Sequence, residues 1–298
     1  MPEQLEAARQ AFTTVSVDPS YRVLAETGLA WILFIDASSE RSAYAPQKCE
    51  AVIQRVAQIS SEQALSLQPL YWRAQCNRKM GRTVEALRDY SMALNKIDPA
   101  GGDTSDSDEL TLQMNAYHGL GTVLITTAGL QDDPNVIAAR ALARRMCTSG
   151  VDEGVADTMK MTRACLDKAI LLRRRLGQTP NQQSGTAENI SFTYLLEGDF
   201  SGALANAQKV ERTGLFAWNE LIRALAAEEV ANGTTDDVEP TDAEAVRATA
   251  AEARRNVSMF APNQFNPCEL QALLTPEVYV KAEAILRQEH ADFDADCA

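Results

Sequence analysis

The side chains of this sequence with the clearest chemical potential are clustered arginines. Residues 140–175 hold nine basic residues against four acidic ones, so this stretch carries about +5 and the rest of the 298-residue chain about −18. Five of these arginines stand at the ends of expected helices: Arg144, Arg145, Arg173, Arg174 and Arg175. One interpretation is a basic patch that binds an acidic segment of a partner protein. The other, which their positions favour, is a solvated face whose cations complement the helix dipole.

No group of residues has the spacing of a catalytic or metal site. The sequence lacks the HExxH and GxSxG motifs and has no glycine-rich phosphate loop after a strand. The acidic stretch Asp103–Glu109 lacks the central glycine and distal glutamate of an EF-hand, so we expect a solvated loop. None of the six cysteines forms a CxxC pair, and we expect buried, reduced thiols rather than disulfides or a zinc site. These observations predict a protein that is not an enzyme and uses no metal or cofactor.

Charge and hydropathy restrict the partners. The formal net charge of −13 argues against whole-molecule attraction to nucleic acid or to an anionic membrane. The longest apolar run, Gly28 to Ile35, is too short to span a bilayer, and the first residues lack the apolar core of a signal peptide. We therefore expect a cytoplasmic protein without direct membrane insertion.

The elements that position these side chains are expected to be helices. Alanine is abundant, prolines fall mostly at segment ends, and no alternating Val/Ile/Thr runs bounded by turns occur. Helices are expected near residues 1–17, 20–36, 47–59, 66–80, 83–97, 109–129, 134–147, 152–176, 215–232, 241–258 and 276–289. A polar linker is expected from Gln178 to Thr186, and Asp133 and Pro134 are expected to start the helix 134–147.

One stretch, Leu70 to Pro99, has a specific pattern of small residues around Gly81. Small residues at such positions allow two helices to approach closely, and a proline ends the second helix. In the first copy the pattern consists of Ala74, Gly81, Ala86, Tyr90 and Ala93. The second copy has Ser191, Gly198, Ala203, Ala207 and Val210 at the same offsets, with Tyr194 as an added aromatic residue. Two copies about 117 residues apart indicate a repeat.

This pattern resembles the tetratricopeptide repeat, a helix–turn–helix unit of about 34 residues. The resemblance implies an all-α solenoid of helical hairpins, a right-handed superhelix with a C-terminal capping helix, forming one domain over 1–298. The clearest repeats are 67–99 and 184–214, the irregular ones 20–60, 109–147 and 215–258, and the capping region 266–290. Arg73 and Asn77 depart from the family pattern, which has apolar residues there. We expect that hairpin either to pack less tightly or to present these two side chains to a partner.

In this family the first helix of each repeat lines a concave groove that binds protein segments. The resemblance implies groove positions at Gln68, Tyr71, Gln75 and Arg78, at Glu188, Phe192 and Leu195, and at Arg22, Ala25, Leu29 and Ile32. For Leu29 and Ile32, packing on neighbouring helices is the favoured interpretation.

We therefore expect a non-catalytic scaffold, adaptor or structural subunit of a larger multi-protein complex. Its partner is expected to be a protein or peptide, and an acidic segment is one candidate. A second hypothesis is a co-chaperone-like receptor for acidic C-terminal peptides. Family members of that kind hold a terminal carboxylate with Lys, Asn and Arg side chains, of which only Arg78 and Lys79 come close here. A third hypothesis is a helical-repeat protein with a small-molecule pocket.

Overall fold

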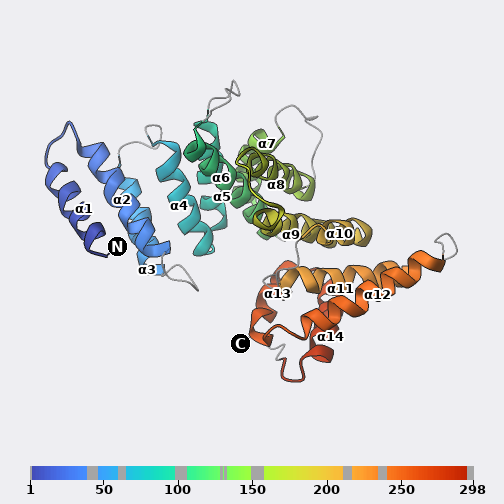
Figure 1. Ribbon diagram of the computed structural model, residues 1–298. Coiled ribbons are helices and arrows are strands. Elements are labelled where there is room, and N and C mark those ends of the chain that lie inside the picture. Colours follow the sequence, from blue (N-terminus) through green and yellow to red (C-terminus); the bar gives the residue numbers. More distant parts are fainter. Residues whose placement is uncertain are drawn as a thin grey trace. The chain divides into compact units, whose positions relative to one another are not determined.

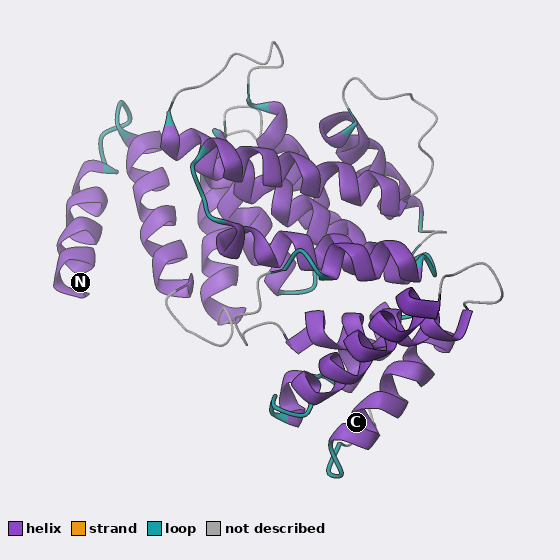
Figure 2. Cartoon of the chain, turned by 45° about the vertical axis from the view of Figure 1, so that its right-hand side comes forward, coloured by secondary structure: helices purple, strands orange, loops and turns teal. Residues whose placement is uncertain are grey.

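The protein is helical throughout the part that the structure, a computed structural model, describes. That part comprises residues 2–38, 46–59, 65–97, 106–127, 130, 133–148, 158–210, 217–233 and 240–293. These residues form helices and turns and contain no strand (Figure 2). The prediction of an all-α protein is confirmed for these residues. None of the described helices combines the length and the apolar character that crossing a bilayer requires.

The helices group into two compact units, residues 1–153 and 154–298. The single solenoid and its superhelical form stay predictions. The predicted acidic loop before Glu109 lies partly outside the described residues, since these resume at Asp106. The start of the helix expected at 152–176 also falls outside them.

The first unit contains seven helices among its described residues (Figure 1). They are α1 (Pro2–Val15), α2 (Arg22–Ser38), α3 (Pro46–Gln58), α4 (Leu67–Lys79), α5 (Thr83–Asn95), α6 (Ser107–Thr126) and α7 (Pro134–Cys147). Each packs on the next, and α2 also packs on α4, α4 on α6 and α5 on α7. Helices α2, α4 and α6 therefore form one row within this unit.

Local sequence explains the hairpin α4–α5. Gly81 has a φ of +70° in the turn, a left-handed conformation that glycine adopts without strain. The small residues Ala74, Ala86 and Ala93 are fully buried, as their spacing predicts. The turn between α9 (Pro180–Leu196) and α10 (Phe200–Ala207) has the same construction, with Gly198 at a φ of +75°. The two segments chosen as the clearest repeats thus share one turn type.

The second unit continues from α8 (Thr158–Arg175) through α9 and α10. It goes on with α11 (Ala217–Gly233), α12 (Pro240–Val257), the 3₁₀ turn η2 (Pro262–Gln264), α13 (Pro267–Leu273) and α14 (Pro276–Glu289). Consecutive helices pack together from α8 to α12, and α14 packs on α11, α12 and α13.

The predicted polar linker from Gln178 to Thr186 is wrong. Helix α9 already begins at Pro180, and Thr179 caps it in a reciprocal capping box with Gln182. Thr followed three residues later by Gln is a helix-start signal, and the polar composition of the segment concealed it.

The expectation that all cysteines are reduced is also wrong. Cys147, Cys165 and Cys268 are disulfide-bonded. Cys49 and Cys76 are free thiols, and both are fully buried. Disulfide formation depends on which thiols meet in space, and spacing along the chain does not reveal that.

Candidate binding groove across α2, α4 and α6

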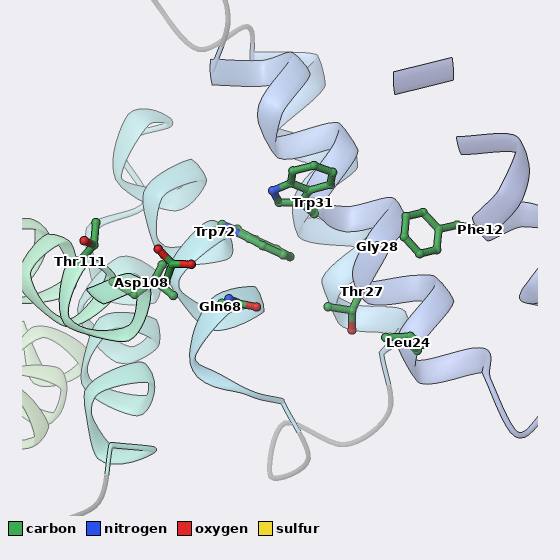
Figure 3. Close-up of a pocket in the computed structure, with 10 residues that line it drawn as sticks. Phe12, Leu24, Thr27, Gly28, Trp31, Gln68, Trp72, Asp108 and Thr111 are labelled. Atoms are coloured by element: carbon green, nitrogen blue, oxygen red, sulfur yellow. The ribbon is translucent and has the colours of Figure 1, made fainter. Parts of the chain in front are cut away.

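A pocket of about 470 Å³ opens across the row of helices α2, α4 and α6 in the first unit (Figure 3). Its lining comes from α1, α2, α4 and α6: Phe12, Leu24, Thr27, Gly28, Trp31, Gln68, Trp72, Asp108, Thr111 and Leu112. A second pocket of about 490 Å³ adjoins it and shares Gln68, Asp108 and Leu112. We call the two pockets together the unit-1 groove.

Helix α2 supplies the apolar wall. Leu24, Thr27 and Trp31 follow one another at three and four residues and therefore share one helical face. Phe12 of α1 lies against Gly28 so closely that a Cβ there would stand 2.4 Å from its ring. Leu24 stays 63% exposed and Trp31 42% exposed. Large apolar side chains that remain exposed beside a pocket are typical of interaction surfaces.

Helix α4 supplies the floor through Gln68 and Trp72, which stand four residues apart. Trp72 is only 6% exposed, and its ring is stacked on Phe34 of α2 with centroids 6.0 Å apart. This stacking positions the indole so that its accessible part faces the pocket next to Trp31 (Figure 3).

Helix α6 supplies a polar, acidic wall. Asp108, Thr111 and Leu112 line the first pocket, and the second adds Ser66, Leu67, Lys96, Asp106 and Glu109. Asp106 caps α6, since its carboxylate accepts the backbone N–H of Asp108 at 2.9 Å. The unit-1 groove thus has an aromatic end on α2 and α4 and an acidic end at the start of α6.

The groove positions expected on α4 are only partly those observed. Gln68 lines both pockets, but Tyr71 is buried against Phe34 and Tyr90. Gln75 donates its amide N–H to the Tyr71 hydroxyl at 2.8 Å, and the Arg78 guanidinium donates to Gln75 Oε1 at 3.1 Å. These three side chains therefore bind one another, and none of them lines the groove pockets.

On α2 the expected face is likewise rotated from the observed one. Ala25, Leu29 and Ile32 are buried, and Arg22 is exposed, but none of the four lines the groove. Core packing of Leu29 and Ile32, the favoured interpretation, is confirmed. One residue along a helix corresponds to 100° of rotation, so a shift of one position turns the expected face away by more than a quarter of a turn.

The second-unit candidates serve internal packing. Phe192 is buried edge-on to Trp218, with centroids 5.8 Å apart, and Leu195 is buried. Glu188 accepts the backbone N–H of Asn219 in the first turn of α11, and partial burial raises its pKa to about 7. A carboxylate at this position satisfies one of the unpaired N–H groups that begin a helix.

Arg73 and Asn77, which depart from the repeat pattern, neither loosen the hairpin nor face a partner. The guanidinium of Arg73 donates to both carboxylate oxygens of Asp89, at 2.9 and 2.6 Å. Asn77 donates to the same carboxylate at 2.9 Å. All three are buried, so they form a satisfied polar cluster between α4 and α5.

The arginines of the proposed basic patch have different environments. Arg144 and Arg145 end α7 in the first unit, and Arg173–Arg175 end α8 in the second. Arg173 donates to Thr186 Oγ1, Gln178 Oε1 and the carbonyl of Gln182, and burial lowers its pKa. It therefore holds the turn into α9. The exposed members are Arg145, Arg174 and Arg175, and their joint role in one patch stays a prediction.

Trp31, Trp72 and Asp108 were missed in the sequence. Their helical spacing relative to Leu24, Gln68 and Leu112 is a usable signal, because each pair shares one face of its helix. Sequence spacing alone does not say which of several such faces stays open.

No protein-family model matches the chain, and no curated protein matches it.

Proposed function

We propose that this chain is a non-catalytic protein-interaction scaffold, adaptor or subunit of a larger assembly, and that the unit-1 groove captures a segment of the partner. The observation that carries this proposal is the half-exposed Trp31 beside Trp72, in a pocket built on a row of three packed helices. Tryptophan in a partly desolvated pocket is the side chain that contributes most often to binding hot spots.

The proposal includes a tetratricopeptide-like architecture. It is supported by the shared glycine turn of hairpins α4–α5 and α9–α10, with Gly81 and Gly198 at positive φ, and by the row α2, α4 and α6. In such arrays the row of first helices lines the binding surface, which is where the unit-1 groove lies.

A co-chaperone-like receptor for acidic C-terminal peptides is less well supported. Arg78 is hydrogen-bonded to Gln75, and the groove itself presents Asp108 and its acidic neighbours. A carboxylate ligand would meet like charges there, which is unfavourable. An enclosed small-molecule site is also less favoured, because Leu24 and Trp31 leave the pocket open along one side.

The disulfide-bonded cysteines bear on the compartment. Cys147, Cys165 and Cys268 are in disulfides, and disulfides persist mainly in oxidising compartments. We therefore propose an oxidising compartment instead of the cytoplasmic location expected from the sequence.

The experiment is affinity purification from the native source with the full chain as bait, compared with the Trp31→Ala and Leu142→Ala variants. Leu142 is a similarly exposed apolar residue on α7, outside the groove. We expect a partner that is retained by the wild-type chain and by Leu142→Ala and is lost with Trp31→Ala. An identical set of proteins on all three baits would contradict the proposal.

A further inference from the structure

We infer that the segment bound in the unit-1 groove contains a large apolar side chain followed or preceded, within about two to four residues, by Lys or Arg. This inference rests on the proposed function and adds the chemistry of the partner. It follows from three properties of the groove: the aromatic end, the acidic end and the separation between them.

The aromatic end accepts the apolar side chain. Trp31 of α2 and Trp72 of α4 are neighbours in the pocket, and Thr27 and Leu24 lie further along α2 (Figure 3). Trp72 is already fixed by Phe34, so binding requires ordering mainly of Trp31. A prearranged apolar surface binds with less loss of conformational entropy.

The acidic end selects the charge of the partner. Asp106, Asp108 and Glu109 line it together with a single cation, Lys96. The N-terminus of α6 contributes about half a positive charge, which offsets only part of the excess of carboxylates over cations among these lining residues. The Asp108 carboxylate faces the pocket beside Gln68 (Figure 3).

Charge complementarity therefore favours a basic segment and disfavours an acidic one. The excess of negative charge over the whole chain, −13, adds long-range attraction for the same kind of partner. The acidic partner expected from the arginines would have to bind at a different surface from this groove.

The separation between Trp72 on α4 and the acidic end on α6 sets the spacing in the ligand. Helices α4 and α6 pack directly on each other, and packed helices lie about 8–10 Å apart. An extended peptide advances about 3.3 Å per residue, so roughly three residues cover this distance. The apolar and the basic side chains would then reach their respective ends together.

The test is selection of random twelve-residue peptides displayed on phage against the full chain, followed by affinity measurement of the enriched peptides by fluorescence anisotropy. We expect enriched peptides with an apolar residue and Lys or Arg at this spacing, and loss of their binding to Trp31→Ala. Acidic or uncharged peptides that still depend on Trp31 would overturn the inference and leave the groove proposal standing. Absence of any Trp31-dependent peptide would overturn both.

A charge-reversal pair sharpens the result. Asp108→Lys should weaken the enriched basic peptides by about fivefold or more, and the effect should shrink as salt concentration rises. The matched control is Glu85→Lys, an exposed glutamate on α5 outside the groove, which should leave the affinity within about twofold. Equal affinities for Asp108→Lys and the wild type would overturn the role assigned to the acidic end.

Discussion

Tyr90 on α5 lies with its ring directly against Gly119 on α6, where a Cβ would stand 2.4 Å from the ring carbon Cζ. Both residues are buried, so α5 and α6 approach each other at a point that only glycine allows. This contact helps place α6, and with it Asp108, relative to the rest of the groove.

We expect Gly119→Ala to lower the free energy of unfolding by about 1–2 kcal/mol, because the cost of overpacking exceeds the gain in helix propensity of about 1 kcal/mol. Urea denaturation measures the change. Gly233→Ala is the control, since no atom lies within 4 Å of a Cβ there; it should change stability by less than about 0.5 kcal/mol. A Gly119→Ala variant more stable than the wild type would show that Tyr90 moves aside freely.

Because Arg73 and Asp89 form a buried ion pair, we expect mutations of the two residues to have strongly coupled effects on the free energy of unfolding. Arg73→Met removes the guanidinium while the Asp89 carboxylate stays buried and still accepts from Asn77, and removing one member of such a pair costs about 3–5 kcal/mol. Replacing both, as Arg73→Met with Asp89→Leu, should recover much of that loss because no charge stays buried. A double-mutant cycle in urea measures the coupling, and strictly additive losses would contradict it.

Glu188 predicts a pH-dependent stability. Its pKa is raised from about 4.5 to about 7 in the folded chain, so the folded state binds more protons than the unfolded state between these values. The free energy of unfolding should therefore fall as pH rises from about 4.5 to about 7, by about 1–3 kcal/mol at 1.36 kcal/mol per pKa unit.

The variant Glu188→Gln removes this titration and can still accept the Asn219 N–H. It should be more stable than the wild type at pH 8, with the advantage shrinking toward pH 5. Denaturant unfolding at both pH values gives the comparison, and Glu85→Gln, at an exposed site, is the control. The same pH dependence in Glu188→Gln and the wild type would exclude this origin.

The arginines at the end of α8 should differ in their contribution to stability. Arg173→Ala removes hydrogen bonds to Thr186, Gln178 and Gln182 and should cost about 1–3 kcal/mol. Arg174→Ala, one residue further and exposed, should be within about 0.5 kcal/mol of the wild type. Thermal unfolding compares them; equal shifts would mean that Arg173 does not hold the turn.

The free thiols of Cys49 and Cys76 should be protected from alkylation in the native chain. Cys49 on α3 and Cys76 on α4 are hydrogen-bonded to each other, and burial raises the pKa of both thiols. Because the thiolate is the reactive form, iodoacetamide at pH 8 should label neither residue in the native chain and both in urea. Peptide mass spectrometry reads the labelling, and rapid native modification of either cysteine would contradict the buried pair.

Much of the helical architecture could be read from local sequence. Asp133 before Pro134 predicts the start of α7, and the side chain of Asp133 does accept the N–H of Asn135. Gly81 predicts the α4–α5 turn, which needs a positive φ. Caps and turns depend on interactions within a few residues, so their signals stay in one short stretch of chain.

The partners of polar side chains were less predictable. Arg73 and Asn77 look misplaced in the sequence because their partner, Asp89, lies on the next helix. The disulfides of Cys147, Cys165 and Cys268 likewise require cysteines that are close together in the folded chain, and the spacing of cysteines along the sequence does not reveal this.

The sequence by itself determined that this chain is helical, where most helices begin and end, and which residues share a helical face. Only the tertiary structure decided which face of α2, α4 and α6 stays open, and hence that Trp31, Trp72 and Asp108 line the groove in place of Tyr71, Gln75 and Arg78. The physical reason is that the 3.6-residue period fixes positions around one helix axis, whereas the rotation of that helix against its neighbours is set by packing. Contacts such as Phe12 on Gly28 set that rotation.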